Sequence, residues 1–159
     1  MDRYSGPHRF TMESWISCAP FERLLGMEIV EATGGRATLV MPFVLELAQG
    51  AGLMHGGALV SLADTAVVMA IKSLVTAQTH FATVSLESKF LYPVKQGLVT
   101  AKAEIIKLEG RMIRGQATVY NDEERPVLEF FSTFKVAKDS TIRGIAFQDN
   151  GNSDSPWKL

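Results

Sequence analysis

The chain of 159 residues contains a single cysteine, Cys18. One cysteine cannot form an internal disulfide, and it cannot supply a cysteine-rich metal site. This favours a reducing setting, so we expect a cytoplasmic protein. Histidine is also scarce, because there are three and their spacing does not suit a shared metal ion: His8, His55 and His80. We therefore expect no metal site.

A surplus of charge of either sign is lacking as well. The chain has 16 Lys and Arg against 17 Asp and Glu, which gives a net charge of −1 at pH 7. A protein without a net positive field has little long-range attraction for nucleic acid, and the aromatic residues do not alternate with a basic patch. We therefore expect no nucleic-acid partner.

No stretch is long and apolar enough to cross a membrane. The best candidate, residues 58–71, is shorter than the roughly 20 apolar residues that a spanning helix needs, and it carries Asp64. The N-terminal residues are polar and lack the basic and then apolar pattern of a secretory signal. We expect no membrane insertion and interpret residues 58–71 as part of a buried helix.

Two common nucleotide-binding and nucleophile motifs are also missing. There is no Gly-Lys-Ser/Thr phosphate loop and no Gly-x-Ser-x-Gly elbow. Gly50-Ala51-Gly52 begins like a dinucleotide loop, but His55 occupies the position of its third glycine. Chemistry that depends on these motifs is therefore not predicted.

The most informative segment that is present is His55-Gly56-Gly57 with the apolar run after it, whose one charged residue is Asp64. Burying an ionised carboxylate without partners is costly, so such a residue is usually paired, protonated or functional. The two glycines lie where a helix begins, and a helix start presents free N–H groups and the positive end of a dipole. An anion-stabilising group and a potential base or nucleophile thus share one element, as acyl transfer requires.

Turn residues and hydrophobic periodicity predict one domain over residues 13–136, between a loose leader (1–12) and a polar, mobile tail (137–159). Six strands and one helix that is apolar on nearly all faces indicate a sheet wrapped around that helix. The uncovered side of the helix would then need a second copy of the chain. The predicted elements are a helix over 14–25, a hairpin of strands 27–33 and 36–41 around Gly34-Gly35, a connection over 42–54, a helix over 55–76, and strands over 82–92, 98–108, 111–120 and 127–136.

This order of elements and the central motif together resemble the hotdog-fold acyl-CoA thioesterases, in particular their PaaI-like branch. In that branch His-Gly-Gly starts the central helix and an acidic residue follows nine positions after the histidine, as Asp64 follows His55 here. The resemblance covers roughly residues 21–136. It implies an α+β fold with about six antiparallel strands around a long helix. It also implies hydrolysis of an acyl-CoA to free acid and CoA without a cofactor, by a homodimer or a dimer of dimers.

The resemblance also implies roles for other residues. Gln49, six positions before the histidine, would orient the attacking water or the thioester, and Ser85 would contact Asp64 or its water. Val68, one helical turn beyond Asp64, would line the acyl pocket. Arg111 lies in a turn similar to one of the family, where it is either a solvated charge or a contact for a CoA phosphate. The identity of the acyl group stays open.

The chemistry places the remaining candidates. The backbone N–H of Gly56, or else of Gly57, would hold the negative charge that develops on the thioester oxygen. Asp64 would activate water as a general base or attack the carbonyl directly, and its apolar surroundings should raise its pKa. His55 is a catalytic candidate too, although we favour a role in which it closes the turn by bonding to the backbone.

Spacing predicts that two subunits share each site. Gly56 and Asp64 are eight residues apart, roughly 12 Å along a helix, too far to hold one carbonyl together. Two antiparallel helices in a dimer would bring Gly56 of one subunit to Asp64 of the other. Two alternatives remain: a catalytically silent acyl-CoA binding or sensing module, and a hydratase or dehydratase of the same fold.

Overall fold

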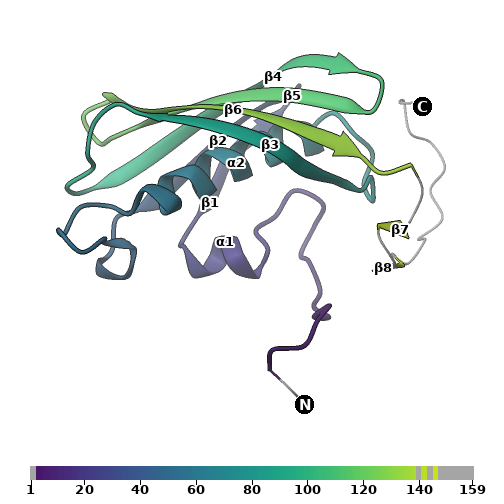
Figure 1. Ribbon diagram of the computed structural model, residues 1–159, viewed down its shortest axis with the longest axis horizontal. Helices are drawn as coiled ribbons and strands as arrows, with labels where there is room; N and C mark the ends of the chain where they lie inside the picture. The colour runs from purple at the N-terminus through teal and green to yellow at the C-terminus, as the bar shows by residue number, and fades with distance from the viewer. Residues whose placement is uncertain (1–2, 139–140, 143–144, 147–159) are drawn as a thin grey trace.

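A curved antiparallel sheet wraps over one side of a long helix (Figure 1) in the computed structural model, which describes residues 3–138, 141–142 and 145–146. The six strands lie in the order β1-β2-β4-β5-β6-β3, and every neighbouring pair is antiparallel. The predicted arrangement of one sheet around a central helix is confirmed. The strands are β1 (Glu28–Thr33), β2 (Arg36–Pro42), β3 (Phe81–Phe90), β4 (Leu98–Glu109), β5 (Met112–Tyr120) and β6 (Pro126–Val136).

The remaining elements are short, apart from the central helix α2 (Gly56–Lys72). They are α1 (Pro20–Leu24), the 3-10 helix η1 (Leu45–Leu47), and the pair β7 (Thr141–Ile142) and β8 (Ile145–Ala146). The last pair falls within the predicted tail, most of which lies outside the described residues. The prediction that this tail is mobile therefore stays a prediction.

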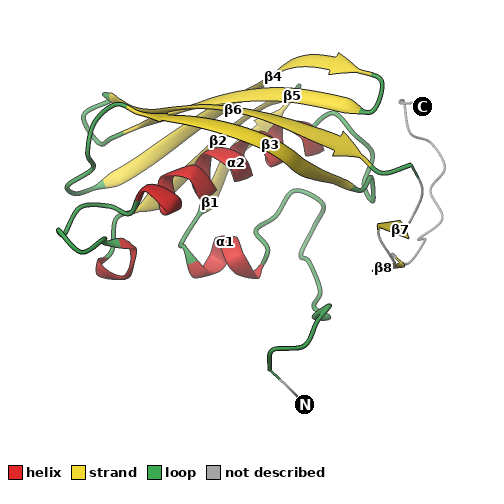
Figure 2. Cartoon of the chain, in the orientation of Figure 1, coloured by secondary structure: helices red, strands yellow, loops and turns green. Residues whose placement is uncertain are grey.

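The predicted helix over residues 14–25 is wrong in its first half. Only α1 is helical there, as the red segment in Figure 2 shows. Proline disfavours the helical conformation in the residue before it, and Ala19 is extended, with φ −76° and ψ 173°. The preceding turn is closed instead by side chains, because the Ser17 hydroxyl donates to the Ser14 carbonyl oxygen at 2.7 Å.

Helix α2 ends about one turn earlier than predicted, at Lys72. The Ser73 hydroxyl donates to the Ala70 carbonyl oxygen at 2.7 Å and accepts a hydrogen bond from the Gly35 N–H at 2.9 Å. Gly35 belongs to the predicted hairpin turn, in which both glycines have positive φ, 57° for Gly34 and 79° for Gly35. The β1–β2 turn therefore fixes the end of the helix.

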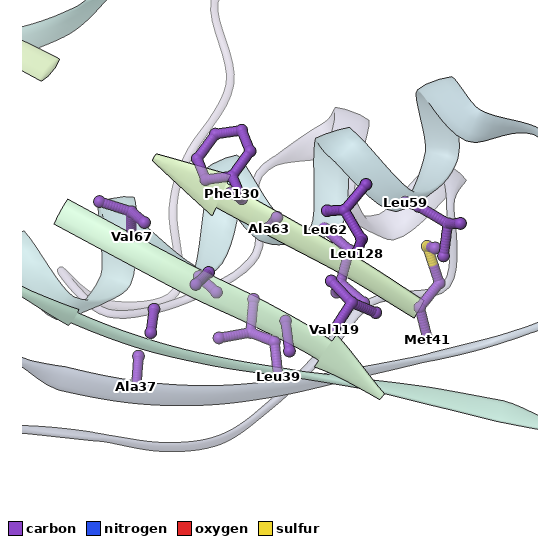
Figure 3. Close-up of a cluster of buried hydrophobic side chains, with 14 of the residues drawn as sticks. Ala37, Leu39, Met41, Leu59, Leu62, Ala63, Val67, Val119, Leu128 and Phe130 are labelled. Atoms are coloured by element: carbon purple, nitrogen blue, oxygen red, sulfur yellow. The ribbon is translucent and has the colours of Figure 1, made fainter. Parts of the chain in front are cut away.

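The core lies between α2 and the inner face of the sheet (Figure 3). The helix approaches the sheet closely at Gly115 of β5, where an added Cβ would lie 2.4 Å from Cγ1 of Val67. Alternation along each strand puts apolar side chains on this inner face. The fully buried large side chains include Leu39, Met41, Leu62, Val67, Val119, Leu128 and Phe130.

Strand β3 is an edge of the sheet, because among the described residues it pairs with β6 alone. It is ten residues long and carries three exposed apolar side chains: Val84 (53% exposed), Leu86 (48%) and Phe90 (55%). A long apolar edge invites pairing with another chain unless it is covered. Strand β3 therefore presents an exposed apolar edge on one side of the sheet.

Candidate active site

Asp64 lies on the one stripe of α2 that the sheet leaves partly uncovered. Most side chains of the helix are buried, but Val60, Ser61, Asp64 and Val68 are half-buried. They recur every three or four residues and therefore share one face of the helix. The carboxylate is thus reachable from the side of the molecule that includes strand β3.

Thr83 of β3 holds the carboxylate of Asp64. Its hydroxyl lies 3.2 Å from each of the two carboxylate oxygens and can donate to either. Burial raises the pKa of Asp64 above its ordinary value, and the hydrogen bond from Thr83 partly offsets this by lowering it. The predicted upward direction of the pKa is thus found here. A carboxylate with a raised pKa is a stronger base than an exposed one.

The contact expected of Ser85 is made by Thr83 instead. A β-bulge between Thr83 and Ser85 inserts Val84 as an extra residue. Thr83 therefore pairs with Phe134, whose side chain points into the core, whereas Ser85 pairs with Thr133 on the opposite face. Ser85 is exposed, and the bulge directs it away from Asp64.

The backbone N–H groups of Gly56 and Gly57 differ in their hydrogen bonding at the start of α2. The Nδ1 atom of His55 accepts a hydrogen bond from the N–H of Gly57 at 2.8 Å, so His55 is the N-cap of the helix. This is the turn-closing role favoured for His55, and it occupies the N–H of Gly57. No described residue accepts a hydrogen bond from the N–H of Gly56. Of the two predicted oxyanion donors, the backbone N–H of Gly56 is therefore the one that stays free to bind a ligand.

The absence of a side chain at Gly56 has a packing reason. An added Cβ would lie 3.0 Å from the ring of Phe90, at the end of β3. At Gly57 it would lie 2.9 Å from Nδ1 of His55, so a larger residue there would disturb the N-cap. Phe90 is a neighbour of the helix start that the sequence pattern did not single out.

Gln49 lies in a tight loop that leads into the helix. Its side-chain oxygen accepts a hydrogen bond from the N–H of Ala51, and its backbone N–H donates to the Leu53 carbonyl oxygen at 2.8 Å. The loop is tied to the helix start, because the His55 N–H donates to the Leu47 carbonyl oxygen at 2.7 Å. The amide nitrogen of Gln49 and the second lone pair of its side-chain oxygen stay available for a water or a thioester.

The two predicted substrate contacts lie in different places. Val68 lines a hollow of about 300 Å³ beside Thr83, next to the candidate base. Arg111 lies in the turn between β4 and β5, and its guanidinium donates to the Val136 carbonyl oxygen at 3.3 Å. In this structure Arg111 ties that turn to the end of β6.

Comparison with known proteins identifies the family of this chain. Residues 51–128 match the model of the thioesterase superfamily. ComA2 of Bacillus subtilis, which is named as an esterase, is 37% identical over 116 residues, covering 72% of this chain and 91% of ComA2. The chain belongs to the thioesterase superfamily. The prediction of a thioester hydrolase is thereby confirmed at the level of the enzyme class.

Several solved structures of other proteins have the same fold as this thioesterase. PaaI of Escherichia coli, from the phenylacetic acid degradation operon, has a TM-score of 0.69 at 23% identity, over 75% of this chain and 85% of PaaI. A hypothetical thioesterase of Streptococcus pneumoniae, solved with coenzyme A, has a TM-score of 0.64 at 21% identity, over 70% and 85% of the two chains. These structures confirm the hotdog fold.

Two further features of the thioesterase concern what surrounds the site. Within the described ranges, no group of three or more His, Cys, Asp or Glu side chains is placed to hold a metal ion. In the same residues no helix has the length and apolar character to cross a membrane. The site described so far therefore consists of a carboxylate, hydroxyl and amide side chains, and a helix start.

Proposed function

We propose that this thioesterase hydrolyses acyl-CoA thioesters, with Asp64 as the base or nucleophile. The observation that carries the proposal is the half-buried carboxylate of Asp64, which is held by Thr83 and has a raised pKa. The coenzyme A bound to the Streptococcus pneumoniae neighbour supports CoA as the thiol part of the substrate. We also propose a cytoplasmic location, because the single cysteine favours a reducing compartment.

The proposed reaction needs water and protein groups. Asp64 removes a proton from water, the hydroxide adds to the thioester carbon, and the carbonyl oxygen takes the negative charge. The intermediate then collapses, the carbon–sulfur bond breaks, and the proton on Asp64 passes to the CoA thiolate. In the alternative route Asp64 attacks the carbon itself, releases CoA and forms a mixed anhydride that water hydrolyses. Both routes need a donor for the oxyanion.

The free N–H of Gly56 is the proposed oxyanion donor, supplied by the partner subunit. The rise of a helix puts Gly56 roughly 12 Å from Asp64 of the same chain. A two-fold axis beside Val60, midway between them in the sequence, would place each chain's Gly56 opposite the other chain's Asp64. Gln49 would orient the water or the thioester from the loop before the helix.

Strand β3 supports the same axis independently. Thr83 touches Asp64 and Phe90 packs on Gly56, so these two strand residues mark the two halves of one site. Their midpoint is at Leu86 and Glu87. If two β3 edges paired antiparallel about that point, Thr83 of one chain would lie opposite Phe90 of the other. The exposed apolar edge would then be covered, as expected for a homodimer. A dimer of dimers stays a prediction.

Release of the CoA thiol from aryl, short and long acyl-CoAs tests the reaction. Asp64→Asn should lower kcat by about 10²–10⁴-fold, the usual contribution of general acid–base catalysis, for every substrate that the wild type uses. Glu123→Gln, in an exposed turn, is the matched control and should keep the wild-type rate. Activity of Asp64→Asn near that of the wild type would remove Asp64 from the mechanism. Binding without turnover by the wild type would favour the silent acyl-CoA module.

Mixed dimers test the shared site. Gly56→Pro removes the proposed donor, and proline is tolerated at the first position of a helix. Gly56→Ala adds the same Cβ against Phe90 but keeps the N–H, so it is the matched control. Each of Gly56→Pro and Asp64→Asn should be inactive alone. An equal mixture should recover about a quarter of wild-type activity, because half of the dimers are mixed and each has one complete site. No recovery after verified exchange would contradict the intersubunit site.

A further inference from the structure

The hollow beside Asp64 has a distinct far end. It holds about 300 Å³, and its lining includes Val68, Thr83, Phe134, Lys72 and Trp15. Asp64, Val68 and Lys72 follow one another at four-residue intervals, so they mark successive turns along one face of α2. The hollow therefore runs from Val68 and from Thr83, which contacts the carboxylate of Asp64, toward the end of the helix, where Trp15 borders it.

Trp15 is held in this position by reciprocal contacts with Lys72. The indole Nε1–H donates to the Lys72 carbonyl oxygen at 3.0 Å, and the Lys72 Nζ donates to the Trp15 carbonyl oxygen at 3.0 Å. The ammonium also lies 4.6 Å from the centre of the indole ring, within cation–π range. These contacts join residues 57 positions apart and bring the segment before α1 to the end of α2 (Figure 1).

The walls between the two ends suit an apolar chain. Phe81 and Phe134 meet edge to face with ring centres 5.9 Å apart, and Val68 lines the helix side. Apolar walls with a polar reaction centre at one end are typical of sites that bind small molecules. An acyl group whose carbonyl lies at Asp64 would extend along these walls toward Trp15.

We propose that Trp15, held by Lys72, is the end wall of the acyl pocket and sets the longest acyl chain that the enzyme accepts. This inference rests on the proposed thioesterase function. The distance along the helix from Asp64 to Lys72 is roughly 12 Å. An extended chain advances about 1.2 Å per bond, which follows from about 3.5 Å for the three backbone bonds of a residue. The wall therefore limits the acyl chain to about ten carbons.

The test measures kcat/KM for saturated acyl-CoAs from two to sixteen carbons, each below its micellar concentration. For the wild type, kcat/KM should fall steeply beyond about ten carbons. Trp15→Ala should raise the ratio of sixteen-carbon to eight-carbon kcat/KM by about tenfold or more, the usual range for misfit in an apolar pocket. The change should lie mostly in KM, because Trp15 is far from the reacting atoms.

Two variants separate this role from a general effect on folding. Lys72→Met removes the ammonium that holds Trp15 but keeps an unbranched stem, and it should shift the same ratio in the same direction by less. Phe21→Ala removes an exposed aromatic side chain (54% exposed) of α1 and should leave the profile unchanged. Should Trp15→Ala fail to fold, Lys72→Met decides the question.

The outcomes distinguish the two proposals. A wild type that hydrolyses none of the acyl-CoAs overturns the proposed function, and this inference with it. A wild type that is active, with folded Trp15 and Lys72 variants that keep its chain-length profile, overturns the end wall and leaves the function standing. A shift of the limit in both variants supports the end wall.

Discussion

The close approach of α2 to the sheet at Gly115 offers a sharp test of how this fold positions its site. An alanine Cβ at this position would lie 2.4 Å from Cγ1 of Val67 and 3.5 Å from the Glu104 carbonyl oxygen. Carbon atoms in contact are normally about 3.5–4.0 Å apart, so the overlap with Val67 exceeds an ångström. Val67 cannot turn away easily, because it is fully buried and a valine in a helix has one dominant rotamer. Gly115→Ala should therefore push the helix off the sheet.

The size of the effect follows from two opposing terms. Overpacking a core typically costs about 1–3 kcal/mol. Replacing glycine by alanine restrains the unfolded chain and returns about 0.4–1 kcal/mol. We expect Gly115→Ala to lower the free energy of unfolding by about 1–2 kcal/mol, and the Tm by about 2–8 °C. Because Asp64 lies one turn from Val67, the shift should also loosen its contact with Thr83 and lower kcat.

A double-mutant cycle with Val67→Ala isolates the contact. Val67→Ala alone removes two buried methyl groups and should cost about 2–3 kcal/mol, from the transfer and cavity terms together. In the double variant the new methyl at position 115 fills the space that Val67 vacates. Its destabilisation should therefore be at least about 1 kcal/mol smaller than the sum of the single effects.

Urea unfolding at one fixed protein concentration measures these values, since a dimer's stability depends on concentration. Gly50→Ala is the control, because an added Cβ there meets nothing within 4 Å, and it should change stability little. Additivity of Gly115→Ala and Val67→Ala within about 0.5 kcal/mol would refute the argument, because it would mean that the two side chains do not compete for space.

Three further predictions concern the site. Thr83→Val removes the hydrogen bond that lowers the pKa of Asp64, so the pH at which kcat/KM reaches half its maximum should rise. An unchanged pH profile would show that Thr83 does not influence the pKa of the catalytic base. Burial raises the folded-state pKa of Asp64, so its contribution to stability is full below the unfolded pKa and is lost as pH rises through the folded pKa. Asp64→Asn should therefore be at least as stable as the wild type at neutral pH by urea unfolding, and a less stable variant would show that the carboxylate stabilises the fold. His55→Ala exposes the N–H of Gly57 and should cost about 1 kcal/mol, which His55→Asn should largely restore.

Local patterns were sufficient for features that depend on neighbouring residues. Gly34-Gly35 predicted a hairpin because both positions need positive φ, and the alternation over residues 98–108 predicted β4 to within a residue. His55-Gly56-Gly57 marked the start of α2, and the apolar run around Asp64 marked it as an exceptional carboxylate. These predictions succeeded because a turn, the start of a helix and the alternation of a strand each depend on only a few neighbouring residues.

Tertiary packing decided what local patterns could not. The bulge at Val84 placed Thr83, and not Ser85, on Asp64, because one extra residue reverses which side chains face the core. The apolar spacing over residues 14–19 resembled that of a helix. In the structure this segment instead contacts the end of α2, because Trp15 and Lys72 exchange hydrogen bonds across 57 positions of sequence. The sequence by itself determined the order of most helices and strands and identified Asp64 as the candidate base. The structure alone decided which face of α2 stays open and what borders it, because contacts between distant residues depend on how whole strands and helices pack.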